Sequence, residues 1–359
     1  MNKRTKVLIC PLDWGLGHAT RCIPIINELI KQDADVYIAV DKAPFDLLIR
    51  EYPQLKFLTF PGIQINYPNP ALMIPYLLFL FPKMLVGIKK ENKYLQDLID
   101  LYKFDVVISD NRYGLWNKST RTVFITHQVT VKTPFWLNFL TPLLFKLSKY
   151  FIDKYNYLWI PDNEDDNNNL TGDLSHKYQI KNKSRFVGIL SRFNKTTAKE
   201  DFVYDICAII SGPEQQRMEF KNLILPQLKD SGKKCVVISG NPIITEPITQ
   251  GNMTYYPHLK KEEMQKVIEQ SKIIISRSGY STIMDLSVLE KNAIFIPTPG
   301  QTEQEYLAQR LMKKGIIYSQ KQKSFNLKMA LEESQNYKGL KLESSPELLA
   351  NAIKEVLKF

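Results

Sequence analysis

Cysteine is scarce in this sequence, and its few cysteines are not arranged as a metal site or a disulfide framework. The 359 residues include four cysteines, which lie far apart or within apolar runs: Cys10, Cys22, Cys207 and Cys235. This pattern excludes a small secreted domain held by disulfides and a zinc-cluster domain. We expect four buried thiols in a reducing compartment, and therefore a cytoplasmic protein.

The sequence also lacks an apolar run of the about 20 residues that a membrane-spanning helix needs. Its two most apolar stretches, residues 71–86 and 134–145, are shorter, contain prolines and are followed by lysines. An aromatic, leucine-rich face bordered by lysines is typical of a segment that lies in the membrane interface. The alternative is that both stretches are buried core helices. We expect a peripheral protein at the inner face of the membrane.

Acidic residues are fewer than basic ones, 37 against 48, and the formal net charge is +11. Such a surplus suits an anionic partner, either nucleic acid or an anionic membrane surface. The lysines are scattered and no familiar nucleic-acid-binding motif is present, so we expect no nucleic acid partner and favour the membrane.

Short apolar runs alternate with helical patterns along the chain. Strands are expected at residues 6–10, 36–40, 57–60, 104–109, 123–126, 157–160, 205–210, 235–239, 253–256, 273–276 and 293–297. This alternation predicts an α/β protein of two Rossmann-like, doubly wound domains that face each other across a cleft. The domains are expected at residues 1–185 and 200–340. A last helix at 345–359, with Ser345 as its cap, is expected to pack back toward the first domain.

Residues 273–285 join a buried strand, a turn of small residues and a helix N-terminus. The backbone N–H groups and the helix dipole at such a terminus attract phosphate. The small residues Ser278 and Gly279 let an anion approach the backbone. Asp285, about one turn into the helix, is suited to accept hydrogen bonds from ribose hydroxyls. The alternative is an ordinary strand-to-helix turn.

A similar junction follows the first strand, where Gly17 and His18 precede a helical pattern. His18 is either a capping or core histidine, or a neutral base that takes a proton from an acceptor hydroxyl or from water. Asp110 and His127 end two other strands at the carboxyl edge, where doubly wound sheets bind ligands. Each of them either faces the same site as His18, on the acceptor side, or caps its own loop.

Arg277 to Asp285 and Pro297 to Tyr306 together resemble the C-terminal signature of inverting nucleotide-sugar glycosyltransferases of the GT-B fold. The similarity is to family 28, the lipid II-forming UDP-N-acetylglucosamine transferases. The Gly17-His18 loop also resembles the N-terminal loop of these transferases and that of a related nucleotide-sugar hydrolase family.

The resemblance implies a role for individual residues, most of them in the second domain. Asp285 stands where the family has a glutamate, and Glu305 replaces one of a pair of glutamines, so the identity of the sugar stays open. Ser211 and Gly212, in another small-residue turn before a helix, are a further candidate phosphate contact. The expected donor contacts are Gly17, Arg192, Ser211, Gly212, Ser278, Gly279 and Tyr280 for the diphosphate, His258 and Leu259 for the base, Asp285 for the ribose, and Gln304 and Glu305 for the sugar.

The expected reaction is transfer of a sugar, N-acetylglucosamine or a related hexose, from a UDP-sugar to a hydroxyl of a lipid-linked or membrane-surface acceptor. The first domain would bind the acceptor, with His18 as base, and the second would bind the donor. The resemblance implies inversion at the anomeric carbon. No Asp-x-Asp triplet is expected to hold a divalent metal to the diphosphate, so we expect neither a metal ion nor another cofactor. The alternative is a nucleotide-sugar hydrolase or epimerase that uses the same His18 on a soluble substrate. A sugar-nucleotide sensor without activity is a third reading.

Overall fold

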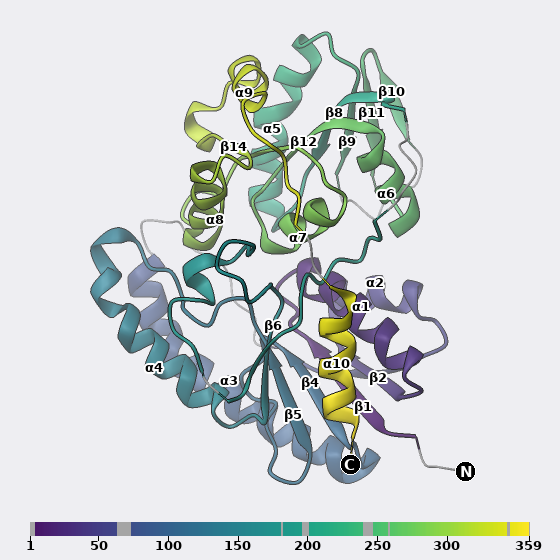
Figure 1. The fold of residues 1–359 in the computed structure, drawn as a ribbon, viewed down its shortest axis with the longest axis vertical. Helices are drawn as coiled ribbons and strands as arrows, with labels where there is room; N and C mark the ends of the chain where they lie inside the picture. The colour runs from purple at the N-terminus through teal and green to yellow at the C-terminus, as the bar shows by residue number, and fades with distance from the viewer. Residues whose placement is uncertain are drawn as a thin grey trace. The chain divides into compact units, whose positions relative to one another are not determined.

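The computed structural model describes residues 4–62, 73–180, 182–195, 201–239, 247–257, 259–342 and 345–358. The chain divides into two compact units (Figure 1). The first unit consists of Met1–Leu190 together with Ser344–Phe359, and the second is Ser191–Glu343. Each unit contains its own sheet and its own apolar core.

The first unit is built on a seven-stranded parallel sheet with the order β3-β2-β1-β4-β5-β6-β7. Its central strands are near-continuous apolar runs, and Val7, Leu8 and Ile9 of β1 are fully buried. Such runs form strands that are covered on both faces. The strands are β1 (Lys6–Pro11), β2 (Asp35–Val40), β3 (Lys56–Thr59), β4 (Val106–Asp110), β5 (Arg121–Ile125), β6 (Tyr157–Ile160) and β7 (Ser184–Phe186).

Helices follow most of these strands, as parallel connections require. The long helix α3, which contains Pro82, is the helix between β3 and β4 in the chain. The helices of this unit are α1 (Leu16–Lys31), α2 (Lys42–Glu51), α3 (Met73–Tyr102), the 3-10 helix η2 (Phe135–Leu140), α4 (Thr141–Ile152), the 3-10 helix η3 (Gly172–Leu174) and α10 (Pro346–Leu357).

The last helix, α10, is part of the first unit although it ends the chain. The Ser345 hydroxyl caps it by accepting from the Glu347 N–H, as its sequence predicts. Its apolar face is buried, and it contacts α1. Two arginines hold it: Arg185 forms a two-point pair with Glu355, and Arg121 donates to the Val356 carbonyl at 3.0 Å.

The second unit repeats the architecture with the strand order β10-β11-β9-β8-β12-β13-β14. All pairs are parallel except the edge hairpin of β10 and β11. The strands are β8 (Tyr204–Ile209), β9 (Cys235–Ile238), β10 (Ile248–Gln250), β11 (Met253–Tyr256), β12 (Ser271–Ser276), β13 (Ala293–Phe295) and β14 (Tyr318–Ser319). The helices are α5 (Glu214–Asp230), α6 (Lys261–Glu269), α7 (Tyr280–Val288), α8 (Thr302–Lys313), the 3-10 helix η4 (Gln322–Ser324) and α9 (Leu327–Ser334).

Both sheets reverse their winding direction once, and in doubly wound sheets this position is the usual place of the ligand site. In the first sheet the reversal lies between β1 and β4, where Pro11 is in register with Asp110. In the second it lies between β8 and β12, where Ile209 is in register with Ser276. Ligands of doubly wound sheets bind beyond the strand ends at this switch point. The prediction of two Rossmann-like α/β domains is confirmed.

The two apolar stretches are helical where the structure describes them, apart from Pro134, which precedes η2 as its N-cap. Residues 71 and 72 lie outside the described residues, and so do the side chains of residues 73–81, Phe135 and Trp136. Within the described ranges, no helix combines the length and the apolar character needed to cross a membrane. The four cysteines are free and buried, as expected.

Candidate functional site

The first half of the site is formed where β1 and β4 end side by side. The loop after β1 leads into α1, whose N-cap is Gly15 and whose first turn contains Gly17 and His18. His18 is therefore not the capping residue. Its side chain, which is 20% exposed, points instead to the fully buried carboxylate of Asp110, the last residue of β4. The distance from His18 Nδ1 to Asp110 Oδ2 is 3.1 Å.

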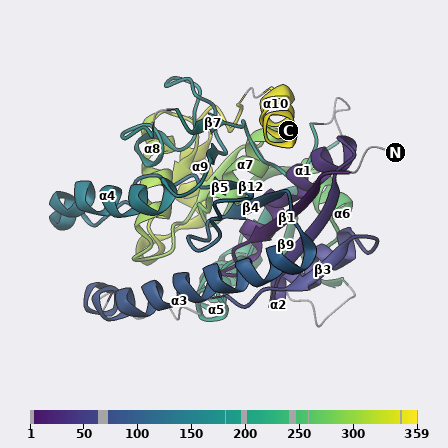
Figure 2. The same ribbon diagram turned by 90° about the horizontal axis from the view of Figure 1, so that it is seen from below.

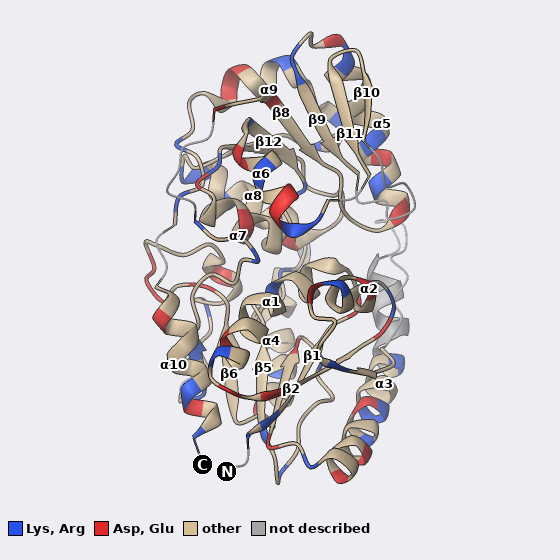
Figure 3. Cartoon of the chain, turned by 90° about the vertical axis from the view of Figure 1, so that its right-hand side faces the viewer, with Lys and Arg blue, Asp and Glu red and all other residues tan. Residues whose placement is uncertain are grey.

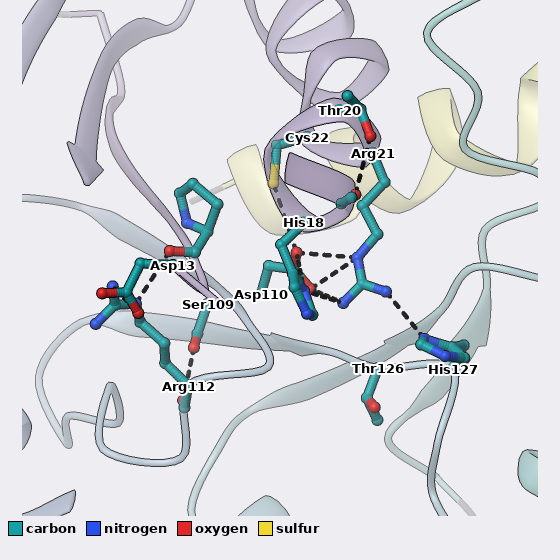
Figure 4. A network of polar contacts seen from close by, with 12 residues as sticks. Asp13, His18, Thr20, Arg21, Cys22, Ser109, Asp110, Arg112, Thr126 and His127 are labelled. Carbon is teal, nitrogen blue, oxygen red and sulfur yellow. Dashed lines mark hydrogen bonds and ion pairs between the residues drawn. The ribbon is translucent and has the colours of Figure 1, made fainter. Parts of the chain in front are cut away.

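Arg21, one helical turn after His18, completes this polar network (Figure 4). Its Nε lies 2.9 Å from both carboxylate oxygens of Asp110, and its Nη2 also donates to Oδ1. The other arm of the guanidinium, Nη1, lies 2.9 Å from Nδ1 of His127. The structure thus brings together three of the predicted residues of the first unit, His18, Asp110 and His127, and adds an arginine whose role the sequence did not predict.

The protonation of this network follows from its burial and its charges. Burial alone would raise the pKa of Asp110, but Arg21 and His18 outweigh it and hold that pKa at about 2. Burial lowers the pKa of His18, and Arg21 lowers it further, while Asp110 acts in the opposite direction. His18 is therefore neutral near pH 7, as a general base must be.

A second buried network, around Arg112 and Asp13, lies to the left of the first in Figure 4. Arg112 donates to Glu91 Oε1 at 2.9 Å and to the Pro11 carbonyl at 3.0 Å, and its Nη2 lies 3.5 Å from Asp13 Oδ1. Burial raises the pKa of Glu91, against the effect of Arg112. This network fixes the loop that leads to His18, because Asp13 belongs to that loop. Sequence reasoning missed it.

The sequence does contain one Asp-x-Asp triplet, Asp33-Ala34-Asp35, in its first half. It lies at the start of β2, at the sheet edge opposite to the switch point. Asp33 pairs with Arg4 at 2.8 Å and Asp35 with Lys56 at 3.5 Å, so both carboxylates have cationic partners. In the described part of the chain, no cluster of three or more His, Cys, Asp or Glu side chains is arranged to hold a metal ion.

The second half of the site is formed by the loops after β12 and β8. Gly279 is the N-cap of α7, with an extended backbone (φ −69°, ψ 139°), and no side chain caps this helix. Ser278, just before it, is buried and donates to the Gln304 carbonyl at 2.8 Å. Tyr280, the first residue of α7, is buried. Across the switch point, the exposed Gly212 has a φ of 109°, a conformation that favours glycine.

Ser211 is half-buried beside Gly212, and the helix that follows, α5, also lacks a side-chain cap. Two uncapped helix N-termini thus begin at the loops that flank one switch point, after β8 and after β12. This is the arrangement that suits a diphosphate. The predicted residues of both loops, Ser211 with Gly212 and Ser278 with Gly279, all lie at this edge of the sheet.

Asp285 and Arg192 form a pair with each other. The Asp285 carboxylate accepts from the Ser191 hydroxyl at 2.7 Å and lies 3.3 Å from Arg192 Nε. Burial raises the pKa of Asp285, and Arg192 and Ser191 oppose that effect. Arg192 also contacts Met264 Sδ at 3.1 Å. Asp285 and Arg192 therefore lie together, and Asp285 fixes Ser191, the first residue of the second unit.

Arg277 points away from the β12–α7 loop into the interior. It donates to the carbonyls of Ile296 and Pro297 and to Gln322 Oε1, and it stacks over the Phe220 ring at 4.2 Å. Burial lowers its pKa to about 10. Its contacts in this structure are those of a core residue that fixes the loop.

The residues expected to contact the sugar and the base differ in their exposure and in their hydrogen bonds. Gln304 Oε1 accepts from the Thr298 N–H at 3.0 Å, so this side chain is fixed in its own loop. Glu305 is exposed and accepts from the Gly300 N–H at 3.2 Å. Leu259 is half-buried just before α6, whereas His258 lies outside the described residues.

Two parallel, doubly wound units within one chain define the GT-B class of fold, the class that the sequence predicted. Residues 227–358 match the family described as Glycosyltransferase family 28 C-terminal domain. The predicted resemblance to family 28 is therefore confirmed for the C-terminal part of the chain.

Similar proteins support the same assignment. A UDP-N-acetylglucosamine–N-acetylmuramyl-(pentapeptide) pyrophosphoryl-undecaprenol N-acetylglucosamine transferase from Sulfurihydrogenibium sp. (strain YO3AOP1) is 26% identical over 177 residues, 46% of this chain. The match spans 50% of that relative's length.

Solved structures share the fold over nearly the whole chain. The glycotransferase of kitacinnamycin aligns with a TM-score of 0.62 and 12% identity over 99% of this chain and 95% of its own. MurG of Acinetobacter baumannii aligns with a TM-score of 0.54 and 11% identity over 99% of this chain and 95% of its own. SnogD from Streptomyces nogalater aligns with a TM-score of 0.60 and 11% identity over 99% and 100%.

Proposed function

We propose that the protein is a glycosyltransferase that moves a sugar from a UDP-sugar to a hydroxyl of a lipid-linked or membrane-surface acceptor, with inversion at the anomeric carbon. One observation carries the proposal: each unit has its predicted site residues at its own switch point, His18 with Asp110 in one and the two glycine loops in the other. The family 28 match and the activity named for the Sulfurihydrogenibium relative support the donor and the acceptor class.

In this mechanism His18 is the general base. We assign His18 the neutral tautomer with its proton on Nδ1, which Asp110 accepts and which leaves the lone pair on Nε2 to take the proton of the acceptor hydroxyl. Arg21 Nη2, 2.9 Å from the same Nδ1, then donates to Asp110 Oδ1 and not to the imidazole. Among the described residues, Nε2 has no hydrogen-bond partner. The acceptor oxygen then attacks the anomeric carbon as the bond to UDP breaks, and inversion follows from this single displacement.

The leaving diphosphate needs its charge stabilised. We propose that the backbone N–H groups at the starts of α5 and α7 do this, with the loops at Gly212 and Gly279 giving close access. The reaction then needs neither a metal ion nor another cofactor. Glu305 is exposed in the first turn of α8. We assign it to a hydroxyl of the transferred sugar, N-acetylglucosamine or a related hexose.

A donor screen followed by turnover assays tests the proposal. A nucleotide sugar that binds should raise the unfolding temperature. At 100 times its dissociation constant it should add about 2.7 kcal/mol to the free energy of unfolding. Transfer is then measured with and without a lipid extract, and with and without EDTA. Turnover that depends on lipid and survives the chelator is expected. Donor hydrolysis that ignores lipid favours the hydrolase or epimerase, and binding without turnover favours the sensor.

The acceptor side of the proposal depends on an exposed apolar surface in the first unit. Along η2 and α4, Phe139 is 73% exposed, Leu143 63% and Tyr150 60%, at a spacing that puts them on one helical face with the exposed Lys146. In Figures 1 and 2, α3 and α4 both extend to the left-hand side of their unit. On the described part of α3, Val86 is 52% exposed, and in Figure 3 the ribbon of that helix is blue and red at its basic and acidic positions. We propose that this surface lies in the headgroup region at the inner face of the membrane.

Replacing Phe139, Leu143 and Tyr150 with serine should reduce binding to anionic liposomes without unfolding the protein, because these side chains are already exposed. The wild-type protein should sediment with the liposomes and be released only in part by salt, since salt screens the lysines but not the apolar contacts. The triple variant should lose the salt-resistant fraction.

A matched control replaces three comparably exposed apolar side chains of the second unit, Met218, Ile248 and Met329, with serine. This control should sediment like the wild-type protein. Equal loss in both triple variants, or a wild-type protein that ignores liposomes, would count against the membrane surface.

A further inference from the structure

Arg21 contacts three side chains that can themselves change charge. It forms a two-point pair with Asp110, it lies 2.9 Å from Nδ1 of His18, and its second arm lies 2.9 Å from Nδ1 of His127. The guanidinium is 2% exposed and the Asp110 carboxylate is completely buried. The proposed function uses the histidine and the carboxylate but gives this arginine no task.

The charges of the network balance only when Arg21 is present. The guanidinium contributes +1 and the ionised carboxylate −1, so the imidazole of His18 can stay neutral. Without Arg21, the carboxylate would be buried with no compensating cation, a costly state that proteins relieve by taking up a proton. His18, 3.1 Å from that carboxylate, is the nearest group that can gain a positive charge.

We propose that Arg21 is a positioning residue that keeps His18 neutral beside an ionised Asp110 and that orients His127 through its second arm. The proposal rests on the proposed function in that neutral His18 is the form that acts as a base there. It assigns Arg21 no contact with the substrate. It makes the basicity of His18 depend on a residue one turn further along the same helix.

The other groups around His18 agree with this assignment. Besides Arg21 on α1, Asp110 faces it from the end of β4, His127 follows β5, and Cys22 Sγ lies 3.9 Å from the same carboxylate. Burial raises the pKa of Cys22 well above its usual value, so it stays a neutral thiol. Arg21 is therefore the cation of this network, and it acts on His18 against the carboxylate.

The histidine titrations test the proposal without any substrate. The chain has four histidines, so selective ¹⁵N-histidine labelling gives few imidazole signals, which single replacements assign. In the wild-type protein His18 should titrate below its ordinary value of 6.5. In Arg21→Gln its pKa should rise by about 1 to 3 units, the effect of an uncompensated carboxylate at this distance. The acidic limb of the activity profile should move by the same amount.

Two further variants make the result specific. Arg185→Gln removes another paired arginine of the same unit, the partner of Glu355 on α10, and should leave the pKa of His18 in place. Arg21→Lys keeps the positive charge but lacks the second arm of the guanidinium, which contacts His127. His18 should therefore titrate as in the wild-type protein while the His127 signals shift. The lysine variant also provides the test if Arg21→Gln does not fold.

The proposal is overturned if His18 titrates above 6.5 in the wild-type protein, if Arg21→Gln leaves its pKa unmoved, or if Arg185→Gln moves that pKa as far. It is also overturned if Arg21→Lys raises the pKa of His18. Because no donor or acceptor is present, these outcomes stand apart from the assays of sugar transfer.

Discussion

The His18→Gln variant is expected to transfer sugar about 100 to 10,000 times more slowly than the wild-type protein, the usual loss when a general base is removed. Glutamine is close in size to histidine and can still donate a hydrogen bond to Asp110, whose carboxylate lies 3.1 Å from the imidazole. It has no lone pair that takes a proton at neutral pH. The measurement is the transfer rate at saturating donor and acceptor.

The affinity for UDP is the internal control for this variant. The glycine loops that we assign to the diphosphate belong to the second unit, Ser191–Glu343, whereas His18 belongs to the first. UDP binding and the unfolding temperature should therefore change little. A transfer rate within about tenfold of the wild-type rate would remove His18 from the role of base.

The Gly279→Asp variant is expected to bind UDP on the order of 100 times more weakly while remaining as stable as the wild-type protein or more so. Gly279 is the N-cap of α7, where aspartate is a preferred residue. An added side chain has room, since the nearest neighbour of a Cβ there is Thr282 Oγ1 at 4.0 Å. The new carboxylate would take the N–H groups that we assign to the diphosphate and repel it by about 3 kcal/mol at roughly 5 Å.

Calorimetric titration with UDP and thermal unfolding check the two halves of this expectation. Gly279→Asn is the matched control, because asparagine caps a helix equally well without the charge. It should lose clearly less affinity than the aspartate variant. If both variants bind UDP as tightly as the wild-type protein, the diphosphate does not lie at the start of α7.

The sequence predicted the parallel sheets well because their strands are buried on both faces. The run Val7-Leu8-Ile9 has little polar character, and β1 forms where it was expected. Three strands were missed: β7, β10 and β14. They have three, three and two residues and stand near or at sheet edges, where neighbours rather than local pattern decide pairing.

The sequence predicted where the site residues lie in the fold better than it predicted which side chains they contact. Strand ends and glycine turns locate His18, Asp110 and Gly279, since parallel strands gather their carboxyl ends at one edge. The partners of buried charges depend on side chains distant in the sequence. Arg21 reaches Asp110 across 89 positions. Asp285 pairs with Ser191 across 94 positions, which no local spacing indicates.

The first unit cannot complete its folding until the ribosome has made the whole chain, because its last helix comes after the second unit in the sequence. Helix α10 buries Ala352, Ile353 and Val356 within that unit, yet it is encoded after the whole of the second unit. At about 5 to 20 residues per second, synthesis of the roughly 150 intervening residues takes on the order of 10 to 30 seconds. During that time the surface of α1 that receives α10 is uncovered on the nascent chain. The second unit can fold in one continuous stretch before the first is complete.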